Sequence, residues 1–115
     1  MIEVAVLNYL NSALSAPVLM EVPENPPDRF VTIEKVGGGI RNHVRTASFA
    51  IQSYSLSSLY EAASLDEEVR SAMDVMADEV DEIGACRMAS DYNFTDTRMK
   101  RYRYQCTYDI TYMEV

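Results

Sequence analysis

Apolar residues recur every fourth position at the start of the chain. Ile2, Val6, Leu10 and Leu14 follow this spacing, with polar residues between them. A period near four positions is typical of an amphipathic helix that buries one stripe. The pattern therefore predicts a helix over residues 2–14, and the next proline along the chain cannot continue it.

The pattern then changes to short runs that favour strands. Val18–Val22 is a short apolar run, whereas Arg29–Val36 and Val44–Ser53 largely alternate between apolar and polar positions. Alternation with a period of two is typical of a strand with one buried face. We therefore expect three strands in the first half of the chain.

Two loops separate these strands. Pro23–Asp28 holds three prolines in five residues, which predicts a stiff, extended connector. Gly37–Gly39 interrupts the second strand, and the segment Gly37–His43 is long for a tight hairpin. This second segment is predicted to project as a flexible loop.

Helical spacing returns at about Ser58–Ala77. Ser58 and Glu61 have the form of a capping box, and Ser64 with Glu67 forms a second one. The second box leaves a kink or a restart open. We expect one helix, because no glycine or proline lies between the two boxes.

The acidic link Asp78–Glu82 leads into two further predicted strands. Ile83–Tyr92 reads as a strand that Gly84 weakens, and Asn93–Thr97 reads as a turn. Lys100–Tyr112 alternates most regularly. One face of this last strand carries Tyr102, Tyr104, Cys106, Tyr108, Ile110 and Tyr112.

These elements follow the order α-β-β-β-α-β-β. Runs of strands joined by short loops favour an α+β fold, with two helices packed on one face of a mainly antiparallel sheet. The 115 residues suit a single domain, and no repeat or linker divides them. We therefore expect one domain over residues 1–115.

The charge balance is acidic, with a formal net charge of −8. A nucleic-acid surface needs an excess of Lys and Arg to displace counterions, so the balance argues against one. Arg98, Lys100, Arg101 and Arg103 do form a local basic patch beside the tyrosines. Base stacking on that strand stays an alternative, but core packing is the favoured interpretation of the tyrosines.

No catalytic or cofactor site assembles from the sequence. The glycines at 37–39 precede a strand, whereas phosphate-binding loops open a helix. His43 has no partner that the sequence identifies, and no serine lies in a nucleophile elbow. We therefore expect no enzyme activity and no cofactor.

A metal site is not expected either. The acidic residues lack the calcium-loop pattern and are interpreted as a solvated face, on which Asp66 and Arg70 form a surface pair. They are Asp66, Glu67, Glu68, Asp74, Asp78, Glu79, Asp81 and Glu82. Cys86 and Cys106 form no Cys-x-x-Cys pair, and free buried thiols are favoured over a bridge.

The N-terminal residues lack the basic start and apolar stretch of a signal peptide. No apolar run approaches the roughly 20 residues that span a bilayer. We therefore expect a chain that folds in the cytoplasm and has no membrane partner.

Several stretches resemble small tail proteins of siphophages and of prophages in Gram-positive bacteria. They are Val22–Lys35, Ala47–Tyr54, Leu59–Ala63, Ser90–Thr97 and the closing Tyr102–Tyr112. The resemblance covers nearly the whole chain in the same order. It is strongest to the tail terminator, or tail completion, family of the lambda tail terminator type.

The resemblance implies an α+β fold and a structural role in virion assembly. It implies a homohexameric ring in the phage neck that caps the tail tube, stops polymerisation of the tube protein and meets the head connector. DNA would pass only through the lumen of this ring. A head-tail connector or stopper at the same junction, and a small DNA-binding accessory protein using Arg98–Arg103, are the alternatives.

Partner contacts are expected in three loops whose residues are not predicted to be in the core: Pro23–Asp28, Gly37–His43 and Asn93–Arg98. Exposed loops carry most binding residues. The candidate contact residues are Pro23, Glu24, Asn25, Pro26, Pro27, Asp28, Gly37, Gly38, Gly39, Arg41, His43, Asn93, Thr95 and Arg98.

Overall fold

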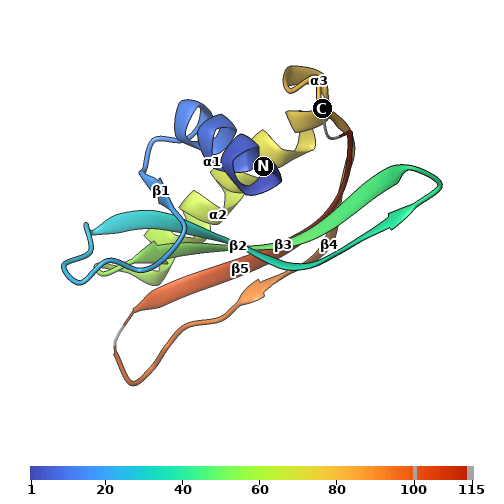
Figure 1. The fold of residues 1–115 in the computed structure, drawn as a ribbon. Coiled ribbons are helices and arrows are strands. Elements are labelled where there is room, and N and C mark those ends of the chain that lie inside the picture. The colour runs from blue at the N-terminus through green and yellow to red at the C-terminus, as the bar shows by residue number, and fades with distance from the viewer. Residues whose placement is uncertain (100, 114–115) are drawn as a thin grey trace.

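The computed structural model describes residues 1–99 and 101–113. Its elements are α1 (Ile2–Ala13), β1 (Val18–Leu19), β2 (Arg29–Arg41), β3 (Val44–Ser55), α2 (Leu59–Asp74), α3 (Met76–Glu79), β4 (Ile83–Asn93) and β5 (Tyr102–Tyr112) (Figure 1). The predicted α+β class and element order are confirmed, with the short α3 as an addition.

The five strands form one sheet in the order β1-β2-β3-β5-β4. Neighbouring strands run antiparallel, except that β1 pairs parallel to β2. Both longer helices, α1 and α2, lie on the same face of this sheet (Figure 1). The predicted arrangement of two helices on one face is therefore the observed one.

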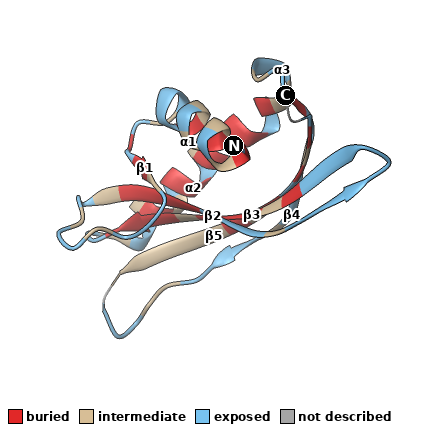
Figure 2. Cartoon of the chain, viewed as in Figure 1, coloured by how far each residue is buried: buried red, intermediate tan, exposed pale blue. Residues whose placement is uncertain are grey.

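The main core lies between the helices and the middle of the sheet. Each layer contributes apolar side chains that are fully buried, which stabilises the fold by roughly 1.5–3 kcal/mol for each large side chain. They include Val6 and Leu10 of α1, Leu65, Val69 and Met73 of α2, Phe49 and Ile51 of β3, and Tyr108 and Ile110 of β5. Figure 2 shows this buried layer in red.

Only the serine half of the first predicted capping box forms at the start of α2, because the Ser58 backbone N–H donates to Ser55 Oγ instead of to Glu61. Ser58 Oγ accepts a hydrogen bond from the backbone N–H of Glu61 at 3.1 Å, while the Glu61 carboxylate accepts one from the Ser55 hydroxyl. The helix passes Ser64 without a break, so the prediction of one helix at that point is correct. It ends at Asp74, earlier than predicted, because the chain leaves the helix at Val75 before α3.

The prediction of a flexible Gly37–His43 loop is wrong. The three glycines lie inside β2, which pairs with β3 as far as Arg41 and Val44, with a bulge between Lys35 and Gly37. Asn42 and His43 alone make the turn, with φ values of 52° and 68°. Positive φ at both central residues is the signature of a type I′ hairpin turn, which is usually built with glycine.

Smaller boundaries also differ from the predictions. β1 ends at Leu19 rather than Val22, because only Val18 and Leu19 pair with β2. Asn93 closes β4 instead of opening a turn, since it pairs with Tyr104 of β5. The predicted first residue of the last strand, Lys100, lies outside the described residues.

The tyrosine face of β5 is only partly core. Cys106, Tyr108, Ile110 and Tyr112 are buried under the helices, as the alternation predicts. Tyr102 and Tyr104 at the start of β5 are half-buried, and Tyr104 lines a surface hollow with Tyr60 and Ala63 of α2. The two cysteines are both free, and Cys106 is the more deeply buried.

Candidate functional site

The β2–β3 hairpin extends beyond the helices, and we call residues 35–45 the hairpin arm. Figures 1 and 2 show that the arm projects away from the helical layer and is exposed along most of its length. It carries apolar side chains that no helix covers: Val36, Ile40 and Val44 are 57%, 62% and 42% exposed. Ile40 pairs with Arg45 and Val44 pairs with Arg41, so Ile40 and Val44 lie on opposite faces of the arm. Exposed apolar side chains on both faces make the arm a candidate surface for contact with another protein.

The arm bounds a surface hollow of about 470 Å³. Lys35, the three glycines, Ile40 and Tyr112 line it. Gly38 keeps the two strands close, because a Cβ at this position would lie 3.1 Å from the Thr46 carbonyl oxygen and 3.2 Å from Lys35 Cε. The glycines therefore shape a packed strand and its hollow, rather than a mobile loop.

The arm and the region beside the other outer edge of the sheet differ in charge. Lys35, Arg41 and His43 of the arm are exposed, and no acidic residue lies between positions 35 and 60. Residues 74–82, which we call the acidic end, contain no basic residue. Its five exposed acids are Asp74, Asp78, Glu79, Asp81 and Glu82.

The three predicted contact loops do not gather at one place. Pro23–Asp28 is the loop that the prolines predict, and Figure 1 places it at the opposite end of the sheet from the arm. The β4–β5 connection lies at that same far end. The candidate contact residues therefore fall into two groups, with only Gly37–Gly39, Arg41 and His43 in the arm.

The two loops at the far end are braced by side-chain hydrogen bonds. Asp28 accepts from the Ser57 hydroxyl at 2.5 Å. Asn93 Oδ1 accepts from the backbone N–H of Thr95 at 3.0 Å, and Asp96 Oδ1 accepts from that of Arg98 at 3.0 Å. These bonds hold Asp28 and the turn at residues 93–98 in shape.

The face of the sheet without helices carries a hydrogen-bonded polar row. Gln52 Nε2 donates to Gln105 Oε1 at 2.6 Å, and Gln105 in turn donates to the Tyr92 hydroxyl. Thr32 and the Tyr54 hydroxyl both donate to Gln52 Oε1. The alternation of Gln52 and Gln105 with core positions is the sequence signal for this row.

An aromatic row lies beside it. Phe30 stacks on Tyr54 with ring centroids 4.5 Å apart, and the Arg103 guanidinium lies 4.3 Å from the Phe94 ring centroid and 5.7 Å from that of Tyr54. Arg103 also donates to the Phe94 carbonyl at 2.6 Å. This arginine is engaged within the fold, as cation–π and hydrogen-bond contacts hold it.

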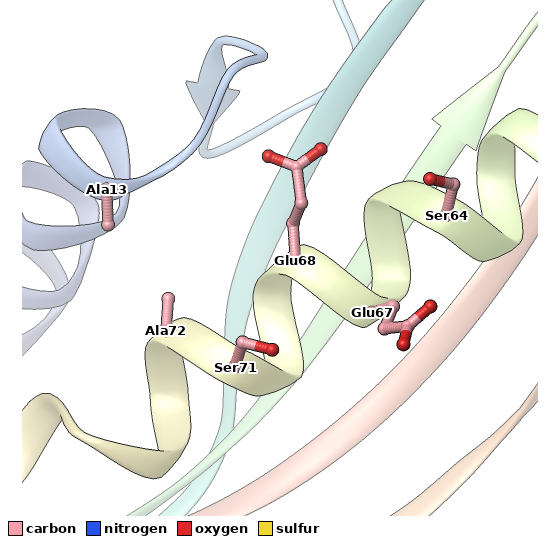
Figure 3. A pocket seen from close by; sticks show the side chains of 6 residues that line it. All are labelled: Ala13, Ser64, Glu67, Glu68, Ser71 and Ala72. Atoms are coloured by element: carbon pink, nitrogen blue, oxygen red, sulfur yellow. The ribbon is translucent and has the colours of Figure 1, made fainter.

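A surface hollow of about 520 Å³ lies beside α2 and the end of α1 (Figure 3). Its Glu68 side chain accepts hydrogen bonds from the Ser15 hydroxyl at 2.9 and 3.0 Å and pairs with Arg29 at 3.2 Å. Glu68 thus ties the α1–β1 connection and the start of β2 to α2. The contacts make this a structural clamp.

Asp66 corrects the interpretation of the acidic run as a solvated face. Its side chain is 1% exposed, and it faces β4 and β5 from the buried stripe of α2. The spacing of Ala62, Asp66, Val69 and Met73 matches that stripe, and this signal was present in the sequence. The predicted pair with Arg70 exists, with Arg70 Nε 3.3 Å from Asp66 Oδ2.

A second carboxylate meets the same arginine. Arg70 Nε lies 3.4 Å from Asp91 Oδ2, and Asp66 Oδ1 has no hydrogen-bond partner in the described part of the chain. Burial and the neighbouring Asp91 raise the pKa of Asp66 to about 7, although Arg70 opposes the shift. The arrangement favours the protonated form of Asp66.

The same cluster has the donor atoms of a metal site. One ligand atom each from Asp66, Asp91 and Cys106 lies within 4.8 Å of the others. The Arg70 guanidinium already supplies positive charge to both carboxylates, and burial raises the pKa of the Cys106 thiol, which opposes the thiolate that a metal needs. A shared proton therefore fits these residues better than a cation.

None of the described helices combines the length and apolar character that crossing a bilayer requires. No protein-family model matches the chain, and a search of curated proteins gives no match.

Proposed function

We propose that this chain is a structural tail terminator of a siphophage. In this role six copies form a ring that caps the tail tube, stops its polymerisation and joins it to the head connector. The observation that carries the proposal is the exposed hairpin arm, whose apolar side chains are uncovered at one outer edge of the sheet. A surface of this kind suits assembly with other protein chains.

The sequence resemblance supports the same role. It covers nearly the whole chain, and the fold that it implies is the α+β fold described above. Outer edges of different character also suit a ring, because head-to-tail contacts between unlike surfaces close into rings when the rotation allows. A ring of acidic subunits would repel phosphate, so DNA in its lumen would slide without sticking.

The side chains that DNA binding would need are largely engaged within the fold. Tyr108 and Tyr112 are buried in the core, and Arg103 is held by Tyr54 and Phe94. Base stacking needs exposed aromatic faces beside free cations. We therefore propose a protein–protein role, with placement in the virion neck after assembly in the bacterial cytoplasm.

Electron microscopy of the purified protein, alone and with tubes of the tail tube protein from the same phage, tests the proposal. We expect six-fold rings of about 100 Å diameter, since each domain has a radius of gyration of 14.0 Å. We also expect the rings at tube ends and a halt in tube growth. Absence of both rings and tube binding would contradict the proposal.

A further inference from the structure

We infer that the hairpin arm of one copy docks against the acidic end of a neighbouring copy. The inference rests on the proposed ring and names the two surfaces that would join its subunits. Arm and acidic end are both defined above, as residues 35–45 and 74–82.

Strand order places the two surfaces on opposite outer edges of the sheet. Across one row, Ile40 of β2 pairs with Arg45, Arg45 with Tyr112, and Tyr112 with Ile83 at the start of β4. The acidic end leads directly into Ile83. The arm and the acidic end therefore lie at the same end of the sheet, one on the β2 edge and one on the β4 edge.

This placement suits contacts between copies rather than within one. Three strand spacings separate the two edges, or roughly 14 Å at about 4.8 Å for each spacing. That separation exceeds the Debye length of about 8 Å at physiological salt, so attraction within one chain is largely screened. Side-by-side copies bring the β2 edge of one to the β4 edge of the next.

The two surfaces are complementary in charge. The arm holds Lys35 and Arg41 without any acidic residue, and the acidic end holds five carboxylates without any basic residue. None of those carboxylates forms an ion pair with another described residue. Complementary potentials set the register of an interface and exclude contacts between like surfaces. Two arms, or two acidic ends, would repel each other.

Apolar groups accompany the charges on both sides. The arm offers Val36 and Ile40 beside its hollow of about 470 Å³. Val75 is 46% exposed within the acidic end. Apolar contact at the centre with charges around it is the usual composition of a protein interface. The occupant of the hollow is therefore the acidic end of a second copy.

The outer edges also have free backbone groups. β1 pairs with β2 only at Val31 and Thr32, so β2 has no described strand on its outer side from Ile33 to Arg41. β4 is the other outer strand of the sheet. Uncovered edges invite pairing with other chains, and a closed ring covers them.

Carbodiimide crosslinking tests the contact, because it joins a lysine to a carboxylate that touches it. The chain has two lysines, Lys35 and Lys100, so the products are few. In a mixture of ¹⁴N- and ¹⁵N-labelled protein, we expect mixed-label crosslinks from Lys35 to residues 78–82. Lys35→Arg keeps the charge, so it should remove these crosslinks and leave the oligomer intact.

Charge reversal gives a second, independent measurement. Lys35→Glu with Arg41→Glu, and separately Asp78→Lys with Glu79→Lys, should each raise the concentration for half-assembly by roughly tenfold or more, because like charges then face each other. A 1:1 mixture of the two variants should assemble as the wild type does. Circular dichroism checks that these exposed substitutions leave the monomer folded.

The outcomes separate the two proposals. Wild-type rings that lack the Lys35 crosslinks, and that neither variant weakens, would overturn this contact and leave the ring in place. Wild-type protein that stays monomeric at high concentration and does not bind tail tubes would overturn the ring itself. Restored assembly in the mixture would support the contact, and its failure after both variants weaken assembly would overturn it.

Discussion

Two regions of the same strand differ in what surrounds them. In β3, Ala47, Phe49 and Ile51 are buried under the helices, whereas Val44 at the tip is 42% exposed. The backbone hydrogen bonds to β2 continue through both regions. The difference shows that strand pairing alone forms the arm, while burial by helices stabilises the body. Burial therefore stabilises one half of the hairpin, and the other half is the surface that we propose for assembly.

The largest effect on stability should come from removing a buried aromatic side chain from the body of the sheet. Phe49→Ala should lower the free energy of unfolding by about 3–5 kcal/mol, because it deletes a fully buried aromatic side chain and leaves a cavity. Ile40→Ala in the arm should change it by less than about 0.5 kcal/mol. Urea denaturation of both variants measures this. Equal losses at the two sites would break the comparison.

Asp66 is the exception within the covered body, and it should make stability depend on pH. The folded pKa of about 7 lies above the unfolded value of 3.8, so the native state binds the extra proton between these limits. The contribution of Asp66 to stability should therefore be fully present below about pH 4 and should fall as the pH rises toward 7. The loss should be on the order of 2 kcal/mol, since the partly exposed Asp91 and Arg70 allow solvent screening.

Asp66→Asn should remove most of this pH dependence and raise stability at pH 8. Glu67→Gln, one position along on the exposed face of α2, is the matched control and should leave the slope unchanged. Thermal melts from pH 4.5 to pH 8 measure both. A slope that survives Asp66→Asn would assign the effect to another group.

The start of α2 offers a smaller test of the covered half. Ser58→Ala should cost about 1 kcal/mol, because it removes the side-chain acceptor for the Glu61 N–H. Ser64→Ala, in the capping box that the structure leaves inside the helix, should cost less than about 0.5 kcal/mol. Chemical denaturation of the two variants compares them. A larger loss at Ser64 would reverse the assignment of the cap.

The smallest expected effect is a gain in the arm. His43 holds a φ of 68°, which is strained for a residue with a Cβ. His43→Gly should stabilise the fold by about 0.5 kcal/mol, since glycine adopts this conformation freely. The melting temperature should rise by a few degrees, as expected for a domain of this size. A lower melting temperature would show that the His43 side chain stabilises the turn.

Much of the fold was predictable because its elements follow simple periods. The stripe of Ile2, Val6 and Leu10 located α1 to within one residue, and Ser58 located the start of α2. The arm was missed because glycines usually end strands, whereas here a bulge accommodates them. The turn was missed because Asn42 and His43 adopt positive φ without glycine.

The candidate contacts were predictable only in part. Exposure of Arg41 and His43 followed from their position between strands, but their place in a paired hairpin depends on pairing that the local sequence does not encode. Asp66 was assigned to the surface by its charge, although its position in the apolar stripe indicated burial. Complementarity between the arm and the acidic end depends on strand order, which periodicity does not determine.

Hydrogen exchange at low and high protein concentration tests the central claim most directly. If the chain assembles through the arm, amides of residues 36–41 and 75–82 should become protected as concentration rises, while those of α1 stay unchanged. Slowed exchange confined to these two segments is the predicted result. Protection that is the same at every concentration, in a protein that remains monomeric and leaves tail tubes uncapped, would contradict the account.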